Sequence, residues 1–134
     1  MDNTPIQILI IEDDPDFIFN LKKRLEASKD LRFEIDSTDT VSGGLKRLKQ
    51  GGINVILLDL NVKDSKGLDT LKRIQPHACG VPIIALTGEY GESLGPEAVK
   101  LGAQDYFLKG EIEPQALVRS IRYSIDRTQI RSEE

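Results

Sequence analysis

Acidic side chains follow two strongly apolar segments of this chain. Residues 8–11 are Ile-Leu-Ile-Ile and lead into Glu12 and Asp13, while residues 55–58 are Val-Ile-Leu-Leu and lead into Asp59. Apolar runs of this length, rich in branched residues, are typical of strands that are covered on both faces of a parallel sheet. The carboxyl ends of such strands form one edge of the sheet, where α/β proteins bind their ligands. If the two strands are neighbours, these carboxylates converge on one pocket.

Carboxylates that lie this close repel one another and raise one another's pKa, unless a cation lies among them. The pattern therefore predicts a site for a divalent metal ion, with one carboxylate free to react.

Two further polar groups follow later strand-like segments. Thr87 comes after residues 81–86, and Lys109 comes after residues 105–108. A carboxylate can attack phosphorus to form an aspartyl phosphate, and Mg²⁺ needs only one or two carboxylates beside phosphoryl oxygens. A hydroxyl and an ammonium group can stabilise the oxygens of the transferring group. The set, one polar group per strand end, indicates phosphoryl transfer to a carboxylate far more specifically than any member alone.

Strand-like and helix-like segments alternate along the chain. Strands are predicted at 6–11, 33–36, 53–58, 81–86 and 105–108, and helices are predicted from Pro15, around 41–48, around 68–74, at 96–101 and from Pro114. This order predicts an α/β fold with a parallel sheet, right-handed crossovers and helices on both faces. Hydrophobicity leaves the order of the strands in the sheet open.

Local signals mark several helix ends. Asp14 before Pro15 is a favourable N-cap for the first helix, and the pair at 51–52, Gly-Gly, is expected to close the second. Pro76 is expected to stop the third helix.

Length and composition limit the class of protein. The chain has 134 residues, 30% of them charged, and a net charge of −4, which argues against direct binding to nucleic acid. No apolar run approaches the roughly 20 residues that span a membrane, so no membrane contact is expected. Cys79 is the only cysteine, which excludes an internal disulfide and favours a cytoplasmic location.

The motifs together resemble a bacterial response-regulator receiver domain of two-component signalling. The resemblance is carried by residues 8–13, 55–61, 67–68, 82–88 and 105–109, and it extends from about residue 6 to about residue 127. It implies one receiver domain over residues 1–134, with 128–134 as an extension of the last helix. It also implies a flavodoxin-like five-stranded sheet of order 2-1-3-4-5 with five helices, acting as a signalling switch rather than as an enzyme.

The resemblance also implies roles for individual residues. Asp59 is the expected phosphoryl acceptor, and a sensor histidine kinase or phosphotransfer protein is the expected donor. The other implied roles are metal binding for Glu12, Asp13, Asp59 and the backbone carbonyl of Asn61, with Mg²⁺ or Mn²⁺ as the ion; phosphoryl binding for Thr87 and Lys109; switching for Thr87 and Tyr106; and tuning of phosphoryl lifetime for Asn61 and Glu89.

The expected output is contact with a downstream protein or effector domain. A homodimer through the fourth helix, the fifth strand and the last helix is a further expectation. Ala116, Tyr123 and Ile130 recur every seven residues on the last helix, which suits a pairing surface.

Two positions depart from the pattern of the family. Gly110 follows Lys109 where the family usually has a proline with a cis bond, and a cis bond before a non-proline residue costs about 2.5–4 kcal/mol. Lys109 is therefore expected to be aimed differently. Lys63 stands where the family often has proline, so the loop after Asp59 is expected to be more mobile.

Two other classes of protein are compatible with part of the pattern. A small phosphatase of the haloacid-dehalogenase type also uses a nucleophilic Asp, but it needs a second Asp two residues later as general acid–base, where this chain has Asn61. A degenerate receiver that acts only as an interaction module is the other alternative, and the complete set of acids, Thr87 and Lys109 argues against it.

Overall fold

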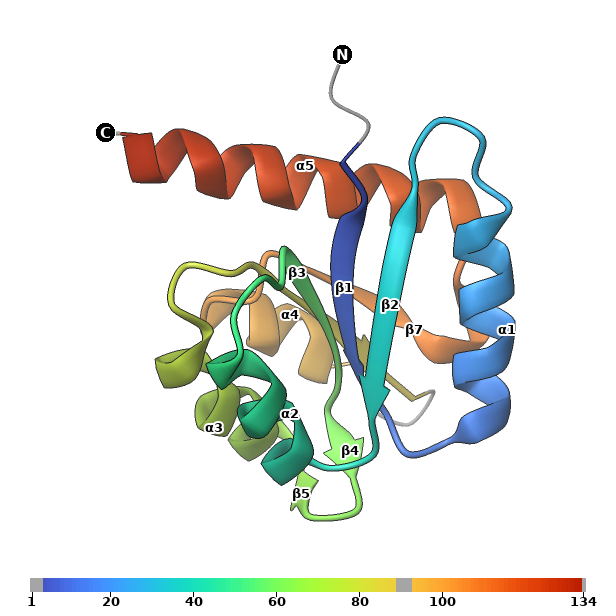
Figure 1. Cartoon of the computed structure of the whole chain (residues 1–134). Coiled ribbons are helices and arrows are strands. Elements are labelled where there is room, and N and C mark those ends of the chain that lie inside the picture. Colours follow the sequence, from blue (N-terminus) through green and yellow to red (C-terminus); the bar gives the residue numbers. More distant parts are fainter. Residues whose placement is uncertain (1–3, 89–92, 134) are drawn as a thin grey trace.

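The computed structural model describes residues 4–88 and 93–133, and it contains one central parallel sheet (Figure 1). The strands of that sheet are β1 (Ile6–Ile11), β2 (Phe33–Thr38), β3 (Val55–Asp59), β6 (Ile83–Thr87) and β7 (Asp105–Leu108), arranged as β2-β1-β3-β6-β7. Counted among themselves, the five strands have the order 2-1-3-4-5, so the prediction of a flavodoxin-like sheet is confirmed.

Helices cover both faces of the sheet. They are α1 (Pro15–Glu26), α2 (Val41–Lys49), α3 (Leu68–Ala78), α4 (Leu94–Lys100) and α5 (Pro114–Glu133), with a short 3₁₀ turn, η2 (Lys109–Glu111), before the last. Alternate residues of β1 point to opposite faces. Leu9 and Ile11 join the core under α2, α3 and α4, while Ile8 and Ile10 join the core under α1 and α5. The central strands are thus buried on both sides, as their apolar runs predict.

The register of the sheet brings the polar strand ends together. Ile11 of β1 lies beside Leu58 of β3, so the next residues, Glu12 and Asp59, adjoin at the edge of the sheet. On the other side of β3, Thr87 of β6 lies beside Leu108 of β7, and Lys109 follows.

The predicted signals at the ends of α1 and α2 are confirmed. The side chain of Asp14 accepts hydrogen bonds from the backbone N–H groups of Asp16 and Phe17, at 3.0 and 3.3 Å. After α2, Gly51 and Gly52 have φ angles of 78° and 84°, a region that glycine enters without steric cost.

Pro76 does not stop α3, so that prediction is wrong. The helix continues to Ala78 and ends where Cys79 enters the left-handed region at a φ of 52°. Proline removes only its own N–H donor, and here it lies in the last turn with few helical bonds left to lose. The burial of Ala78 against the core under α2, α3 and α4 holds this turn in place.

Other element boundaries shift by two residues. The strands β3 and β6 begin at Val55 and Ile83, two residues later than predicted, and α4 begins at Leu94, two residues earlier. Pro96 is therefore the third residue of α4, where a backbone N–H has no partner within the helix and its absence costs little. In the described part of the chain, no helix is long and apolar enough to cross a bilayer.

The segment after Asp59 forms a small antiparallel hairpin that the sequence analysis did not predict. Its strands are β4 (Asn61–Val62) and β5 (Ser65–Lys66). Contacts from Asp64 and Lys63 tie it to the start of α2: Asp64 accepts hydrogen bonds from the N–H groups of Val41 and Ser42, at 2.8 and 3.1 Å, and Lys63 pairs with Asp39 at 2.8 Å.

Candidate functional site

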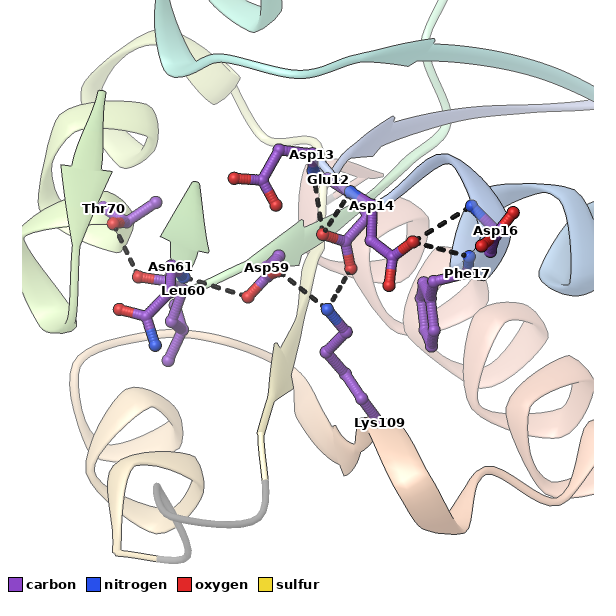
Figure 2. A network of polar contacts seen from close by, with 10 residues as sticks. All are labelled: Glu12, Asp13, Asp14, Asp16, Phe17, Asp59, Leu60, Asn61, Thr70 and Lys109. Atoms are coloured by element: carbon purple, nitrogen blue, oxygen red, sulfur yellow. Dashed lines mark hydrogen bonds and ion pairs between the residues drawn. The ribbon is translucent and has the colours of Figure 1, made fainter. Parts of the chain in front are cut away.

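Three carboxylates meet at the carboxyl edge of the sheet (Figure 2). One oxygen each from Glu12, Asp13 and Asp59 lies within 4.8 Å of the others. Glu12 is completely buried and Asp59 is 3% exposed, whereas Asp13 is half-buried. The strand order causes this convergence, because β1 and β3 are neighbours and end at the same level. Hard oxygen ligands in this number suit a divalent cation.

Lys109 supplies a positive charge within this cluster. Its Nζ lies 2.5 Å from Oε1 of Glu12 and 3.1 Å from Oδ2 of Asp59. The ammonium group also lies 4.7 Å from the centroid of the Phe17 ring. Burial alone lowers the pKa of an ammonium group, but the two carboxylates outweigh this effect and raise the pKa of Lys109. The lysine therefore stays charged and partly compensates the buried acids.

The environment of Glu12 strongly disfavours its charged form. Burial, and then the neighbouring Asp59, raise the pKa of Glu12 from 4.5 to about 8, although Lys109 opposes both. The second oxygen, Oε2, accepts hydrogen bonds from the backbone N–H groups of Asp13 and Asp14, at 2.8 and 3.2 Å. These bonds orient the carboxylate toward Lys109 and Asp59.

The carboxylate of Asp59 is held at both of its oxygens. The backbone N–H of Asn61 donates to Oδ1 at 2.9 Å, and Lys109 donates to Oδ2 at 3.1 Å. The side-chain oxygen of Asn61 accepts a hydrogen bond from the N–H of Gly67 at 3.2 Å, which fixes the Asn61 side chain on the hairpin segment.

Thr87 presents a buried hydroxyl at the same edge of the sheet. Its side chain is 1% exposed, and its Oγ1 finds no hydrogen-bond partner among the residues that the structure describes. An unpaired buried hydroxyl costs roughly 1–3 kcal/mol, so this oxygen is suited to a ligand that brings its own acceptor.

Tyr106 is half-buried on β7 and packs against the core under α4. A Cβ atom added to Gly95 of α4 would overlap atoms of the Tyr106 ring, so the ring lies directly against the backbone of that helix. Glu89 lies outside the described residues, and its expected tuning role stays a prediction.

The two departures from the family pattern have structural counterparts. Every peptide bond in the described part of the chain is trans, including that between Lys109 and Gly110, and Lys109 still reaches both Glu12 and Asp59. Lys63, where proline is common, lies in the hairpin and pairs with Asp39.

Sequence reasoning missed the polar residues that hold the segment after Asp59. Thr70 on α3 is fully buried and bonds to this segment, and Asp64 joins it to α2. Their signals were weak: a threonine near the start of a helix and an aspartate in a loop are common without any such contact.

Comparison with known proteins identifies the family. The family model described as the response regulator receiver domain matches residues 8–122. The nitrate/nitrite response regulator protein NarP of Escherichia coli is 31% identical over 130 residues, which cover 97% of this chain and 60% of NarP. A homolog of this regulator in Haemophilus influenzae is 33% identical over 119 residues, covering 87% of this chain and 55% of that protein.

Solved structures agree with this match. A response regulator receiver domain protein from Clostridium thermocellum superimposes with a TM-score of 0.81 at 26% identity, covering 93% of this chain and 98% of that one. Full-length FixJ from B. japonicum gives a TM-score of 0.83 at 25% identity, covering 97% of this chain and 62% of FixJ.

Fold, acidic cluster and family match define a signalling domain of the two-component type. The chain belongs to the response-regulator receiver family. It spans between about half and three fifths of the length of the curated relatives described above.

Proposed function

We propose that this protein is a phosphorylation-controlled switch in which Asp59 accepts a phosphoryl group. The observation that carries the proposal is the placement of Asp59. It is nearly buried, it is oriented at both oxygens by Asn61 and Lys109, and it lies among Glu12 and Asp13. This arrangement supports an acceptor that is aligned and compensated before a donor arrives.

The proposed donor is a phosphohistidine of a sensor kinase or phosphotransfer protein. An oxygen of Asp59 attacks phosphorus, the bond between phosphorus and the imidazole nitrogen breaks, and the imidazole takes up a proton. Lys109 stabilises charge on the transferring oxygens, and the unpaired hydroxyl of Thr87 donates a hydrogen bond to one of them.

The residues present fit a divalent cation. Three carboxylates within 4.8 Å, two of them buried, leave more negative charge than Lys109 alone compensates. We propose that Glu12, Asp13, Asp59 and the backbone carbonyl of Asn61 hold Mg²⁺ or Mn²⁺. A bound cation of this kind would neutralise negative charge on the acceptor and on the transferring phosphoryl group.

The decisive experiment uses acetyl phosphate as the donor, with and without Mg²⁺, and follows the protein by intact mass. The wild-type protein is expected to gain one phosphoryl group only with the metal. The Asp59→Asn variant keeps the size of the side chain but replaces one acceptor oxygen by an amide nitrogen, so it has no carboxylate to phosphorylate and is expected to gain none. Equal phosphorylation of this variant at the same site would refute the assignment.

The switch is proposed to act through Thr87 and Tyr106. Movement of the Thr87 hydroxyl toward a phosphoryl group on Asp59 would open space near β7. The Tyr106 ring would then pack differently against α4. The result is a changed surface over α4, β7 and α5, which would be read by a downstream protein or effector domain.

A homodimer through that same surface is also proposed. Three large apolar side chains there are exposed: Val99 and Leu101 near α4, each 41%, and Tyr123 of α5, 64%. Size measurement by light scattering, with and without beryllium fluoride as a phosphoryl mimic, tests it. A mass that stays monomeric in both states at high concentration would exclude the dimer.

The alternative functions gain little support. Asn61 offers an amide, already bonded to Gly67, where a haloacid-dehalogenase phosphatase needs its acid. A module that only binds partners would have no need of an oriented acceptor beside Lys109. A cytoplasmic location, and a single receiver domain whose last helix extends over 128–134, remain predictions.

A further inference from the structure

A buried threonine lies one peptide unit away from the acceptor. Thr70, the third residue of α3, is completely buried, and its hydroxyl bonds to the segment after Asp59 rather than to Asp59 itself. Its Oγ1 lies 2.9 Å from the carbonyl oxygen of Leu60 and 2.9 Å from Oγ of Ser65. A threonine in a helix commonly bonds to a carbonyl of its own helix, whereas this one reaches ten residues back, into the segment after Asp59.

The direction of these hydrogen bonds follows from the atoms involved. A carbonyl oxygen can only accept, so Thr70 donates its single hydroxyl proton to Leu60. The Ser65 hydroxyl must then donate to the oxygen of Thr70. The order of donation runs from Ser65 to Thr70 to Leu60, and each bond polarises the next.

This series of hydrogen bonds continues to Asp59, the proposed phosphoryl acceptor. The carbonyl of Leu60 and the N–H of Asn61 belong to one planar peptide unit, so they cannot turn independently. The same N–H donates to Oδ1 of Asp59 at 2.9 Å. Figure 2 shows this peptide held from its two sides, by Thr70 at the carbonyl and by Asp59 at the N–H.

We infer that Thr70 is a positioning residue for phosphoryl transfer to Asp59. Its buried hydroxyl fixes the plane of the peptide between Leu60 and Asn61, and that plane fixes the carboxylate. The inference rests on the proposed role of Asp59 as acceptor. Without the hydroxyl, the peptide can tilt, the Asn61 N–H leaves Oδ1, and Asp59 samples orientations in which it cannot attack.

The test compares two substitutions of the same residue. Thr70→Val keeps the shape of the side chain but removes the donor, whereas Thr70→Ser keeps the donor and loses a methyl group. The matched control is Ser124→Ala on α5, because Ser124 is another buried hydroxyl residue, 1% exposed, and lies far along the chain from Asp59. All are assayed with acetyl phosphate at saturating Mg²⁺, and the amide proton shift of Asn61 is recorded by NMR without donor.

Thr70→Val is expected to be phosphorylated roughly tenfold more slowly, the low end of the effect seen when a partner that orients a metal-binding side chain is removed. Its Asn61 amide proton is expected to move upfield as the hydrogen bond to Asp59 weakens. Thr70→Ser is expected to keep most of the wild-type phosphorylation rate, with an Asn61 amide chemical shift close to that of the wild-type protein. Ser124→Ala is expected to keep the wild-type rate, whatever its stability.

Two results would overturn the inference: a Thr70→Val protein with wild-type rate and unshifted Asn61 amide, or a Thr70→Ser protein as slow as Thr70→Val. If the wild-type protein itself accepts no phosphoryl group, the proposed function fails. The positional role of Thr70 is then decided by the Asn61 amide shift alone.

Discussion

The ammonium nitrogen of Lys109 lies 2.5 Å from Oε1 of the fully buried Glu12. This single ammonium group faces three carboxylates, those of Glu12, Asp13 and Asp59, so it compensates their negative charge only in part. Under the proposed function, the same lysine would compete with a metal ion for Glu12 and would prepare Asp59 for a phosphoryl group.

Removing this lysine should have opposite effects on metal binding and on phosphorylation. Lys109→Ala is expected to bind Mg²⁺ more tightly, because no ammonium group competes for the carboxylates, while phosphorylation by acetyl phosphate slows by at least about tenfold. In EDTA at pH 8 the variant is expected to lose up to about 3 kcal/mol of unfolding free energy, since buried acids remain uncompensated. Calorimetric titration and urea denaturation measure the two effects.

Lys63→Ala is the matched control for that substitution. Lys63 also pairs with a carboxylate, Asp39, but both side chains are more than half exposed. Solvent screening should keep the loss of stability small. Lys63 also interacts electrostatically with Asp13, so a slight gain in Mg²⁺ affinity is expected, much smaller than that of Lys109→Ala. Equal losses of unfolding free energy in Lys63→Ala and Lys109→Ala would contradict a special role for the buried pair of Lys109 and Glu12.

The affinity for Mg²⁺ should rise with pH. Glu12 has its pKa raised to about 8 in the metal-free protein, so below that pH an arriving ion must displace a proton. Release of one proton makes the affinity rise by at most about tenfold per pH unit between pH 6 and 8, and level off above. Titrations at a series of pH values test this, and Glu12→Gln is expected to show a flat, weaker profile.

The raised pKa of Glu12 also predicts how the stability of the folded protein depends on pH. An unfolded chain releases the Glu12 proton near pH 4.5, whereas the folded chain keeps it to about pH 8. The folded state binds more protons in this window, so the contribution of Glu12 to stability is lost as pH rises from about 4.5 to about 8. Melting curves in EDTA should show this fall and Glu12→Gln should not. Curves with no difference between the two proteins would be inconsistent with the raised pKa.

Asp64 should hold the hairpin after Asp59 to α2. Its carboxylate accepts from the N–H groups of Val41 and Ser42, and Arg73 donates to its backbone carbonyl at 2.6 Å. Asp64→Ala removes a cap-like contact and is expected to lower the unfolding free energy by about 1–2 kcal/mol. Urea denaturation provides the measurement, with Asp126→Ala on the exposed side of α5 as the control. A loss of unfolding free energy no larger than that of the control would argue against a role of Asp64 in holding the hairpin to α2.

Tyr106 should be able to pack against α4 in its observed position only because residue 95 is a glycine. Gly95→Ala places a methyl group on the ring and is expected to cost about 1–3 kcal/mol of unfolding free energy. In a Tyr106→Ala background the same substitution should cost almost nothing, because the overlapping atoms are gone. Gly88→Ala, where an added Cβ has open space, is the control. Additive losses in the double variant would show that the ring does not rest on Gly95.

Many local features of this protein follow from its sequence. The apolar runs before Glu12 and Asp59 are buried on both faces of a sheet, as runs of four branched apolar residues typically are in a covered parallel sheet. The cap at Asp14 depends on neighbours one to three residues away. The repeated position of polar residues at strand ends marks Glu12, Asp13, Asp59, Thr87 and Lys109 as a set.

Only the tertiary structure decided which of these groups touch. Glu12 lies beside Asp59 because β1 pairs with β3, and hydrophobicity carries no information about strand order. Burial of Ala78 overrode the helix-breaking tendency of Pro76. Thr70 reaches Leu60 because α3 packs back onto the segment after β3, which places a hydroxyl ten residues away against the peptide that orients Asp59. Contacts between residues far apart in sequence depend on the packing of whole elements, and no local pattern encodes them.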